Sequence, residues 1–184
     1  MRQKRTTDQT RELIFQACGQ ILREQGARSL TLEAVARQAG LSKGGLLYHF
    51  PNKETLVQAL FEYHAAKFDA RLLKLAEEEG RSQGGWLRAY MQASVEEILD
   101  PENAGLLVSL YAAGEEFPWV HAFMRRRYDA WQAAVENCGL EPALATLIRL
   151  AVDGLWFSEM YQYAPPDEAR RGQIAGLIFK LTQT

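Results

Sequence analysis

Apolar residues recur along most of the chain at spacings of three and four positions, which is the period of an amphipathic helix. Alternation of period two, which would indicate strands, is nearly absent. Glycines, prolines and residues suited to capping a helix stand between the apolar stripes. The pattern therefore predicts an all-α fold of nine helices, at about 8–25, 32–39, 43–50, 53–79, 86–99, 101–113, 118–137, 142–163 and 168–181.

The stretch from Thr31 to Lys53 carries the most specific pattern. Its first helix follows Thr31, whose hydroxyl can cap the first turn, and stops at Gly40, where a left-handed residue closes a helix at least steric cost. Ser42 caps a second, short helix, which Pro51 ends because the residue before a proline is pushed out of helical geometry. Two helices joined by a short glycine-containing turn form a helix-turn-helix, whose second helix enters the major groove of DNA.

Within that second helix, Leu46 and Phe50 lie four positions apart and are expected to face the core. Two adjacent glycines cost a helix about 1 kcal/mol each relative to alanine, so their presence needs a reason. Close approach of the backbone to DNA is one reason, and a loose helix that orders on binding is another. The residues left for solvent or DNA are Lys43, Gly44, Gly45, Leu47, Tyr48 and His49.

Charge is distributed unevenly along the chain. Residues 1–54 hold nine lysines and arginines and five acids, a net charge of +4, whereas the whole chain has a net charge of −2. A basic head suits phosphate binding, because neutralised phosphates supply most of the sequence-independent affinity for DNA. The arm from Arg2 to Thr7 is either a frayed terminus or a source of further DNA contacts.

The helix predicted at 53–79 is long enough to leave the head and enter a second body, at about 40 Å for a rise of 1.5 Å per residue. We therefore expect two domains that share a helix, a three-helix head at 1–54 and a helical body at 55–184. No apolar stretch approaches the roughly 20 residues needed to cross a bilayer, and no signal peptide is evident. A cytoplasmic protein with reduced thiols at Cys18 and Cys138 is expected.

No pattern of catalytic or metal-binding residues is evident. The three histidines, His49, His64 and His121, show no metal-ligand spacing. The chain has neither a glycine-rich phosphate loop after a strand nor a serine nucleophile elbow. The sequence therefore predicts no enzyme activity, metal or cofactor.

The second domain is rich in aromatic side chains, for which core packing is the default interpretation. Small-molecule cavities are also mostly apolar with a few polar groups, so the same region is a candidate effector site. Its candidate residues are His64, Trp86, Tyr90, Tyr111, Phe123, Trp131, Asp153 and Phe157. Nearby acids would suit a cationic, lipophilic effector through charge and cation–π contacts: Glu96, Glu97, Glu115, Glu116, Asp153 and Glu159. Arg125-Arg126-Arg127 is expected to be a solvated face.

The stretch from Leu32 to Leu60 resembles the DNA-binding head of the tetracycline-repressor (TetR) family of bacterial regulators. Beyond about residue 65 the similarity is one of architecture. The residues that carry the resemblance are Val35-Ala36, Ala39-Gly40-Leu41-Ser42, Lys43-Gly44, His49-Phe50-Pro51-Asn52-Lys53-Glu54 and Leu56.

This resemblance implies that the short second helix reads the major groove of double-stranded operator DNA. Thr31 and Lys53 would bind DNA phosphates, and Lys43 and His49 would also contact DNA. Gly44, Gly45, Leu47 and Tyr48 would face bases. Many members carry tyrosine at the position of Leu47, whereas this chain has its tyrosine one place later, so the contact made by that aromatic stays open.

The resemblance also implies a homodimer formed through the last two helices, and therefore a palindromic operator. The implied contact residues are Leu147, Leu150, Ala151, Gly154, Leu155, Ser158, Ile174, Leu177, Ile178 and Leu181. The implied function is a repressor that releases its operator when a small, lipophilic effector binds the second domain. The alternative is a helical adaptor that binds a protein through the helix-turn-helix. The net charge of +4 on residues 1–54 argues against this alternative, because binding a protein would not require it.

Overall fold

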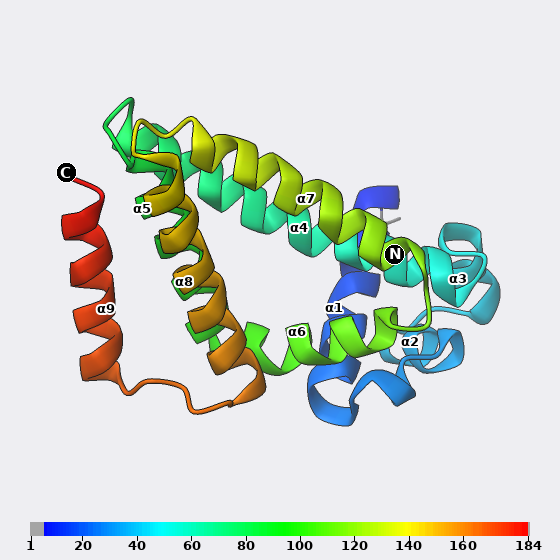
Figure 1. Ribbon diagram of the computed structural model, residues 1–184. Helices are drawn as coiled ribbons and strands as arrows, with labels where there is room; N and C mark the ends of the chain where they lie inside the picture. Colours follow the sequence, from blue (N-terminus) through cyan, green and yellow to red (C-terminus); the bar gives the residue numbers. More distant parts are fainter. Residues whose placement is uncertain (1–5, 184) are drawn as a thin grey trace. The chain divides into compact units, whose positions relative to one another are not determined.

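The computed structural model describes residues 6–183, and its elements are helices joined by turns and loops (Figure 1). Over this range the prediction of an all-α fold with nine helices is confirmed, and one short 3-10 turn adds to it at Ala27–Ser29 (η1). Residues Arg2–Arg5 of the predicted arm lie outside the described residues. The α-helices are α1 (Thr7–Gln25), α2 (Leu32–Gln38), α3 (Lys43–His49), α4 (Lys53–Glu79), α5 (Gly85–Leu99), α6 (Pro101–Gly114), α7 (Trp119–Glu136), α8 (Pro142–Tyr161) and α9 (Glu168–Leu181).

Polar caps explain where several of these helices begin. The side chains of Thr31, Ser42, Asn52 and Asp167 each accept a hydrogen bond from the backbone N–H three residues later, at 2.7–3.1 Å. Each bond satisfies an amide that the helix itself leaves without a partner. The predicted bounds of α4 and α9 match those of the structure, and the cap that precedes each helix explains why its first residue was predictable.

The main difference from the predicted bounds lies at the end of α8. That helix ends at Tyr161, two residues before the predicted end, because Gln162 and Ala164 adopt φ values of 55° and 51°. A left-handed residue stops a helix, and a non-glycine residue in that conformation leaves no signal in the sequence.

The described chain forms two compact units. The first consists of the chain up to His64 together with Gly105–Phe117, so it takes in more of the chain than the head predicted at residues 1–54. α4 and α6 each contribute to both units. The most deeply buried side chains of the first unit are Ile14, Ile21, Leu22, Leu30, Val35, Leu46, Leu56, Val57, Leu60, Leu106 and Leu110.

The second unit consists of Ala65–Ala104 and of the chain from Pro118 onward. Its core is built mainly from the second half of α4 and from α5 and α8, and α7 and α9 contribute Val135 and Ile178. Buried members include Leu72, Leu75, Leu87, Tyr90, Ala93, Val135, Ala145, Ile148, Val152 and Ile178. Cys18 and Cys138 are free thiols. No helix within the described range is long and apolar enough to span a bilayer.

Candidate functional site

The turn between α2 and α3 is closed by backbone hydrogen bonds. Gly40 has a φ of 63°, and its N–H donates to the carbonyl of Arg37 at 3.2 Å. The N–H of Leu41 donates to the carbonyl of Ala36 at 2.9 Å. These two bonds make a Schellman turn, in which glycine is the residue with the least steric cost. The turn fixes the direction in which α3 leaves α2.

One side of α3 is anchored in the core of the first unit. Leu46 is fully buried and Phe50 is 2% exposed. The ring of Phe50 lies 5.9 Å from that of Phe15 on α1, and the guanidinium of Arg11 lies 4.9 Å from the same ring. The other side of α3 carries Tyr48, which is 84% exposed. Because its inner side is packed in the core, α3 holds the side chains of its outer side in fixed positions.

The two glycines of α3 have different explanations. A Cβ added at Gly45 would lie 3.2 Å from Oγ of Ser42, the oxygen that caps the helix. Glycine at this position therefore protects the cap. A Cβ added at Gly44 would meet nothing within 4 Å. Packing inside the protein therefore does not require glycine at this position.

Two lysines, the first residue of α3 and the first residue of α4, are held in ion pairs. Nζ of Lys43 lies 2.7 Å from the Glu33 carboxylate of α2, and Nζ of Lys53 lies 2.7 Å from the Glu116 carboxylate. The hydrogen bond from Lys43 lowers the pKa of Glu33. Both pairs are accessible to solvent, and an ion pair of this kind contributes little to stability, so a phosphate can displace the carboxylate. Thr31 accepts its capping bond through its oxygen, which leaves the hydroxyl proton free to donate.

The first unit contains all eight predicted DNA-contacting residues, of which seven lie on α3 or at the start of α4 and Thr31 lies immediately before α2. Four of them are exposed, namely Thr31, Lys43, Gly44 and Tyr48. The other four are half-buried, namely Gly45, Leu47, His49 and Lys53. The individual contacts with bases and phosphates stay predictions.

Four of the predicted effector residues meet in the second unit. The rings of Trp86 and Tyr90 stack at 5.3 Å, and Tyr90 lies 5.4 Å from Trp131. The Tyr90 hydroxyl donates to the Asp153 carboxylate at 2.6 Å. Burial raises the pKa of both Tyr90 and Asp153. Because Tyr90 is only 3% exposed, this part of the cluster is core, and only its edge is open to a ligand.

The remaining predicted effector residues are spread over the chain. Phe123 lies on α7 in the second unit. Phe157, 49% exposed on α8, stacks on Tyr161 at 5.8 Å. His64 and Tyr111 belong to the first unit, where the Tyr111 ring packs edge-on against Phe61. Their roles in effector binding stay predictions.

Most of the acids that suggested a cationic effector already have partners. Glu97 accepts a hydrogen bond from the Trp156 indole at 3.1 Å, and burial raises its pKa to about 7. The pairing partners lie far away in sequence in most cases, so no local pattern indicated them. The structure therefore offers little support for a cationic ligand. Four of the six acids form ion pairs: Glu96 with Arg71, Glu116 with Lys53, Asp153 with Arg149 and Glu159 with Arg171.

A groove of about 490 Å³ runs along α7 in the second unit. Three of the predicted effector residues line it, namely Trp86, Phe123 and Trp131. Arg126 and Arg127, which were expected to belong to a solvated face, line it as well. Arg127 points into the unit and binds Asp69 through two hydrogen bonds of 2.6 and 2.9 Å. The full lining is Asp69, Leu72, Leu73, Trp86, Phe123, Arg126, Arg127, Ala130, Trp131 and Ala134.

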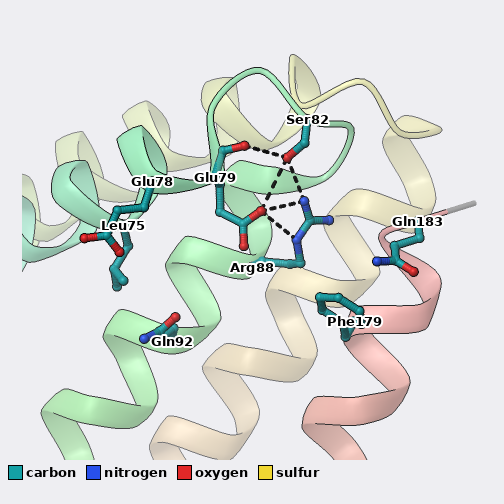
Figure 2. Close-up of a pocket in the computed structure, with 8 residues that line it drawn as sticks. All are labelled: Leu75, Glu78, Glu79, Ser82, Arg88, Gln92, Phe179 and Gln183. Atoms are coloured by element: carbon teal, nitrogen blue, oxygen red, sulfur yellow. Dashed lines mark hydrogen bonds and ion pairs between the residues drawn. The ribbon is translucent and has the colours of Figure 1, made fainter.

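Figure 2 shows a second, more polar pocket of about 360 Å³ around Arg88, with Phe179 and Gln183 from the end of the chain on one side. All five N–H groups of Arg88 are engaged. They donate to the Glu79 carboxylate, to the Ser82 hydroxyl and to the carbonyls of Gln83 and Thr182, at 2.7–3.1 Å. Arg88 thus ties the α4–α5 loop to the end of α9 and has no donor left for a ligand.

The predicted dimerisation residues fall into two groups. Five are exposed, namely Leu147, Leu150, Ala151, Gly154 and Leu177. Leu155 and Ile178 are buried in the unit's own core, and Ser158, Ile174 and Leu181 are half-buried. A Cβ at Gly154 would meet nothing within 4 Å, so this face leaves room for a close approach. Three of the exposed residues are leucines, and exposed leucines that gather in one patch are typical of a surface that another chain covers.

Comparison with known proteins matches both parts of the chain. Residues 14–60 match the model for bacterial regulatory proteins of the tetR family, and residues 84–183 match the tetracyclin repressor-like C-terminal domain. The HTH-type transcriptional regulator TtgR of Pseudomonas putida is 28% identical over 151 residues, which cover 80% of this chain and 70% of TtgR.

Solved structures share the fold at low sequence identity. A protein of Pseudomonas aeruginosa PAO1 assigned as a transcriptional regulator superposes with a TM-score of 0.77 at 17% identity, over 96% of this chain and 91% of that one. The multidrug-binding protein EbrR, in complex with malachite green, superposes with a TM-score of 0.64 at 20% identity, over 95% and 98% of the two chains.

Proposed function

Because the chain belongs to the tetracycline-repressor (TetR) family of transcription regulators, we propose that it is a dimeric repressor that binds a palindromic operator and releases it when a small lipophilic effector binds. Regulators of this family bind DNA and are not enzymes. A cytoplasmic location is part of the proposal. The observation that carries the proposal is the position of α3, which has one side buried in the core of the first unit and the other side exposed to solvent.

The outer side of α3 has the composition that base reading requires. Tyr48 projects from it with 84% of its surface exposed, and its ring lies edge-on to that of the neighbouring His49 at 5.3 Å, so most of the ring stays accessible to a base. At Gly44 no side chain covers the helix backbone, so a ligand could approach it closely. In helix-turn-helix proteins the recognition helix contacts base edges with its N-terminal residues while neighbouring groups bind phosphates. Thr31, Lys43 and Lys53 are proposed as the phosphate contacts.

Dimerisation is proposed through the exposed face of α8 and α9. Two such faces would form a four-helix contact related by a two-fold axis, with Leu147, Leu150 and Leu177 covered and Gly154 at a close crossing. A two-fold protein presents two copies of α3, so the operator is expected to contain two inverted half-sites.

The effector is proposed to act through α4. This helix contributes Lys53 to the first unit and Leu72 and Leu73 to the groove of the second. A ligand that favours one position of α4 over another would shift the population of the dimer toward an arrangement with weaker operator affinity. EbrR, whose structure contains malachite green, gives a precedent for a small ligand in this fold.

Fluorescence anisotropy on labelled DNA flanking the gene tests the proposal, with salt and competitor DNA varied. We expect a dissociation constant on the order of nanomolar that resists non-specific competitor, and an affinity that falls steeply with salt. The proposal would be contradicted if the protein bound neither this DNA nor any sequence selected from random DNA more tightly than unrelated DNA. That result would favour a protein partner for the helix-turn-helix.

A further inference from the structure

We propose that the effector is a small amphipathic anion, an aromatic or acyl body with one carboxylate, that lies in the α7 groove with its carboxylate on Arg126. The inference rests on the proposed function and names the ligand class of that function. It reverses the ligand charge that the acid-rich sequence suggested. Three observations carry it: the shape of the groove, its apolar lining and its unbalanced charge.

The groove is the right size for a small ligand and is built on one face of α7. Its volume of about 490 Å³ lies inside the range of about 300–1,000 Å³ found for small-molecule sites. Its α7 residues recur every three or four positions, so they share one face of the helix. They are Phe123, Arg126, Arg127, Ala130, Trp131 and Ala134.

Apolar side chains in this groove remain open to solvent. Leu73 of α4 is 62% exposed, and Ala130 of α7 is also exposed. Trp86 and Trp131 are half-buried, so each ring offers part of its surface to the groove. A flat aromatic or an acyl chain would cover these surfaces and gain the free energy of removing them from water.

The charge of the lining is set by three residues. Both oxygens of Asp69 accept hydrogen bonds from Arg127, whose guanidinium also lies 4.8 Å from the centre of the Trp131 ring. This pair is therefore neutral as a unit and held in place. Arg126 makes no hydrogen bond or ion pair among the residues that the structure describes, and its side chain lines the groove. The lining carries one uncompensated positive charge.

A cation would find no matching group in the groove. Asp69 is the only acid in the lining, and binding a cation there would require breaking its two bonds to Arg127. Glu97 does not line the groove and accepts the Trp156 indole proton. An arginine guanidinium, by contrast, matches a carboxylate with two parallel hydrogen bonds.

Isothermal titration calorimetry of the full chain with three probes of one shape tests the inference. The probes are biphenyl-4-carboxylate, the neutral biphenyl-4-methanol and the cationic biphenyl-4-ylmethylammonium. We expect the carboxylate to bind about fivefold more tightly than the alcohol, as an accessible ion pair allows, and the ammonium to bind most weakly. Arg126→Ala should abolish this preference. Arg125→Ala, which removes the same charge one position outside the lining, should keep it.

A second variant tests the location. Ala130→Trp places an indole in the groove from an exposed position of α7, so it should weaken binding of all three probes at least tenfold. Equal affinities for the three probes, a preference for the ammonium, unchanged binding to Ala130→Trp, or no binding of any probe would each overturn the inference.

The calorimetry contains no DNA, so the two proposals fail separately. Carboxylate binding at the groove by a protein that never binds DNA specifically would overturn the proposed function and uphold the ligand class. Specific DNA binding by a protein that ignores all three probes would overturn the ligand class and leave the DNA-binding part of the proposed function intact.

Discussion

Lys53, at the start of α4, lies 2.7 Å from the carboxylate of Glu116, in the segment Gly105–Phe117 of the same compact unit. A lysine proposed to bind a DNA phosphate is thus neutralised by an acid of its own chain. The two side chains are 35% and 54% exposed, so the pair is accessible and contributes at most about 1 kcal/mol. We therefore expect Glu116 to compete with a DNA phosphate for Lys53 without preventing DNA binding.

Removing the competitor should strengthen binding to any DNA sequence. Glu116→Gln is expected to raise affinity for non-specific DNA by about two- to fivefold at low salt, because Lys53 no longer leaves a carboxylate to bind a phosphate. Anisotropy on a random-sequence duplex measures this. Glu115→Gln, which changes the net charge equally at an exposed neighbour without an ion pair in the described structure, is the control. An equal gain in both variants would mean that only net charge matters.

Gly44→Ala should separate stability from DNA binding. Alanine at this open helical position is expected to raise the free energy of unfolding by up to about 1 kcal/mol. The added methyl would stand between the helix backbone and the DNA, so specific affinity should fall about tenfold. Urea denaturation and anisotropy provide the two readouts. Gly105→Ala, also a helical glycine with open space around its Cβ, should gain stability and keep DNA affinity. Undiminished DNA binding by Gly44→Ala would show that the DNA does not approach this backbone.

The dimer contact can be tested with a charge in its centre. Leu150 is 53% exposed in the subunit, so Leu150→Glu should fold normally, but in the dimer the new carboxylate would be buried without a partner. We expect the variant to sediment as a monomer at roughly 10 μM, a concentration at which we expect the wild type to sediment as a dimer. Leu99→Glu, at a 42% exposed leucine of α5, is the control. A dimer that survives Leu150→Glu would move the contact to another face.

Glu97 predicts a pH dependence of stability. Burial raises its pKa from 4.5 to about 7, so the folded protein holds this proton more tightly than the unfolded chain. The stability due to the neutral carboxyl is complete at low pH and is lost as pH rises from about 4.5 to about 7. Arg127 and Asp69 are the charged groups that act on it, and they act in opposite directions.

Glu97→Gln removes this titration and keeps an oxygen to accept the Trp156 indole proton. It should raise the free energy of unfolding by roughly 1–3 kcal/mol at pH 8 and by much less at pH 5. Urea denaturation at both pH values checks this. Glu96→Gln is the contrast, because the hydrogen bond from Arg71 lowers the pKa of Glu96 and its loss should not stabilise the protein at pH 8. An equal effect of Glu97→Gln at the two pH values would show that the carboxyl titrates normally.

Local signals made the helices predictable. Caps such as Asn52 and Asp167 and the turn residue Gly40 act within four positions of the helix ends that they define, so the sequence shows both partners at once. The buried side of α3 followed from the spacing of Leu46 and Phe50 for the same reason.

Partners distant in sequence were not predictable. Arg71 and Glu96, or Asp69 and Arg127, meet only because separate helices pack together, and no residue near either partner indicates the other. The three adjacent arginines looked alike in sequence, yet packing turns Arg127 inward, whereas Arg125 and Arg126 are both exposed and only Arg126 of these two lines the groove. The inclusion of Gly105–Phe117 in the first unit likewise depends on tertiary packing.

A selection from random DNA tests most directly the central claim that α3 reads a DNA sequence. The wild-type protein is expected to enrich two inverted half-sites, and Tyr48→Ala to lose the preference at one or more positions of each half-site while Lys53→Ala keeps the pattern with lower affinity. Failure of the wild type to enrich any sequence, or an unchanged pattern from Tyr48→Ala, would contradict the role given to α3.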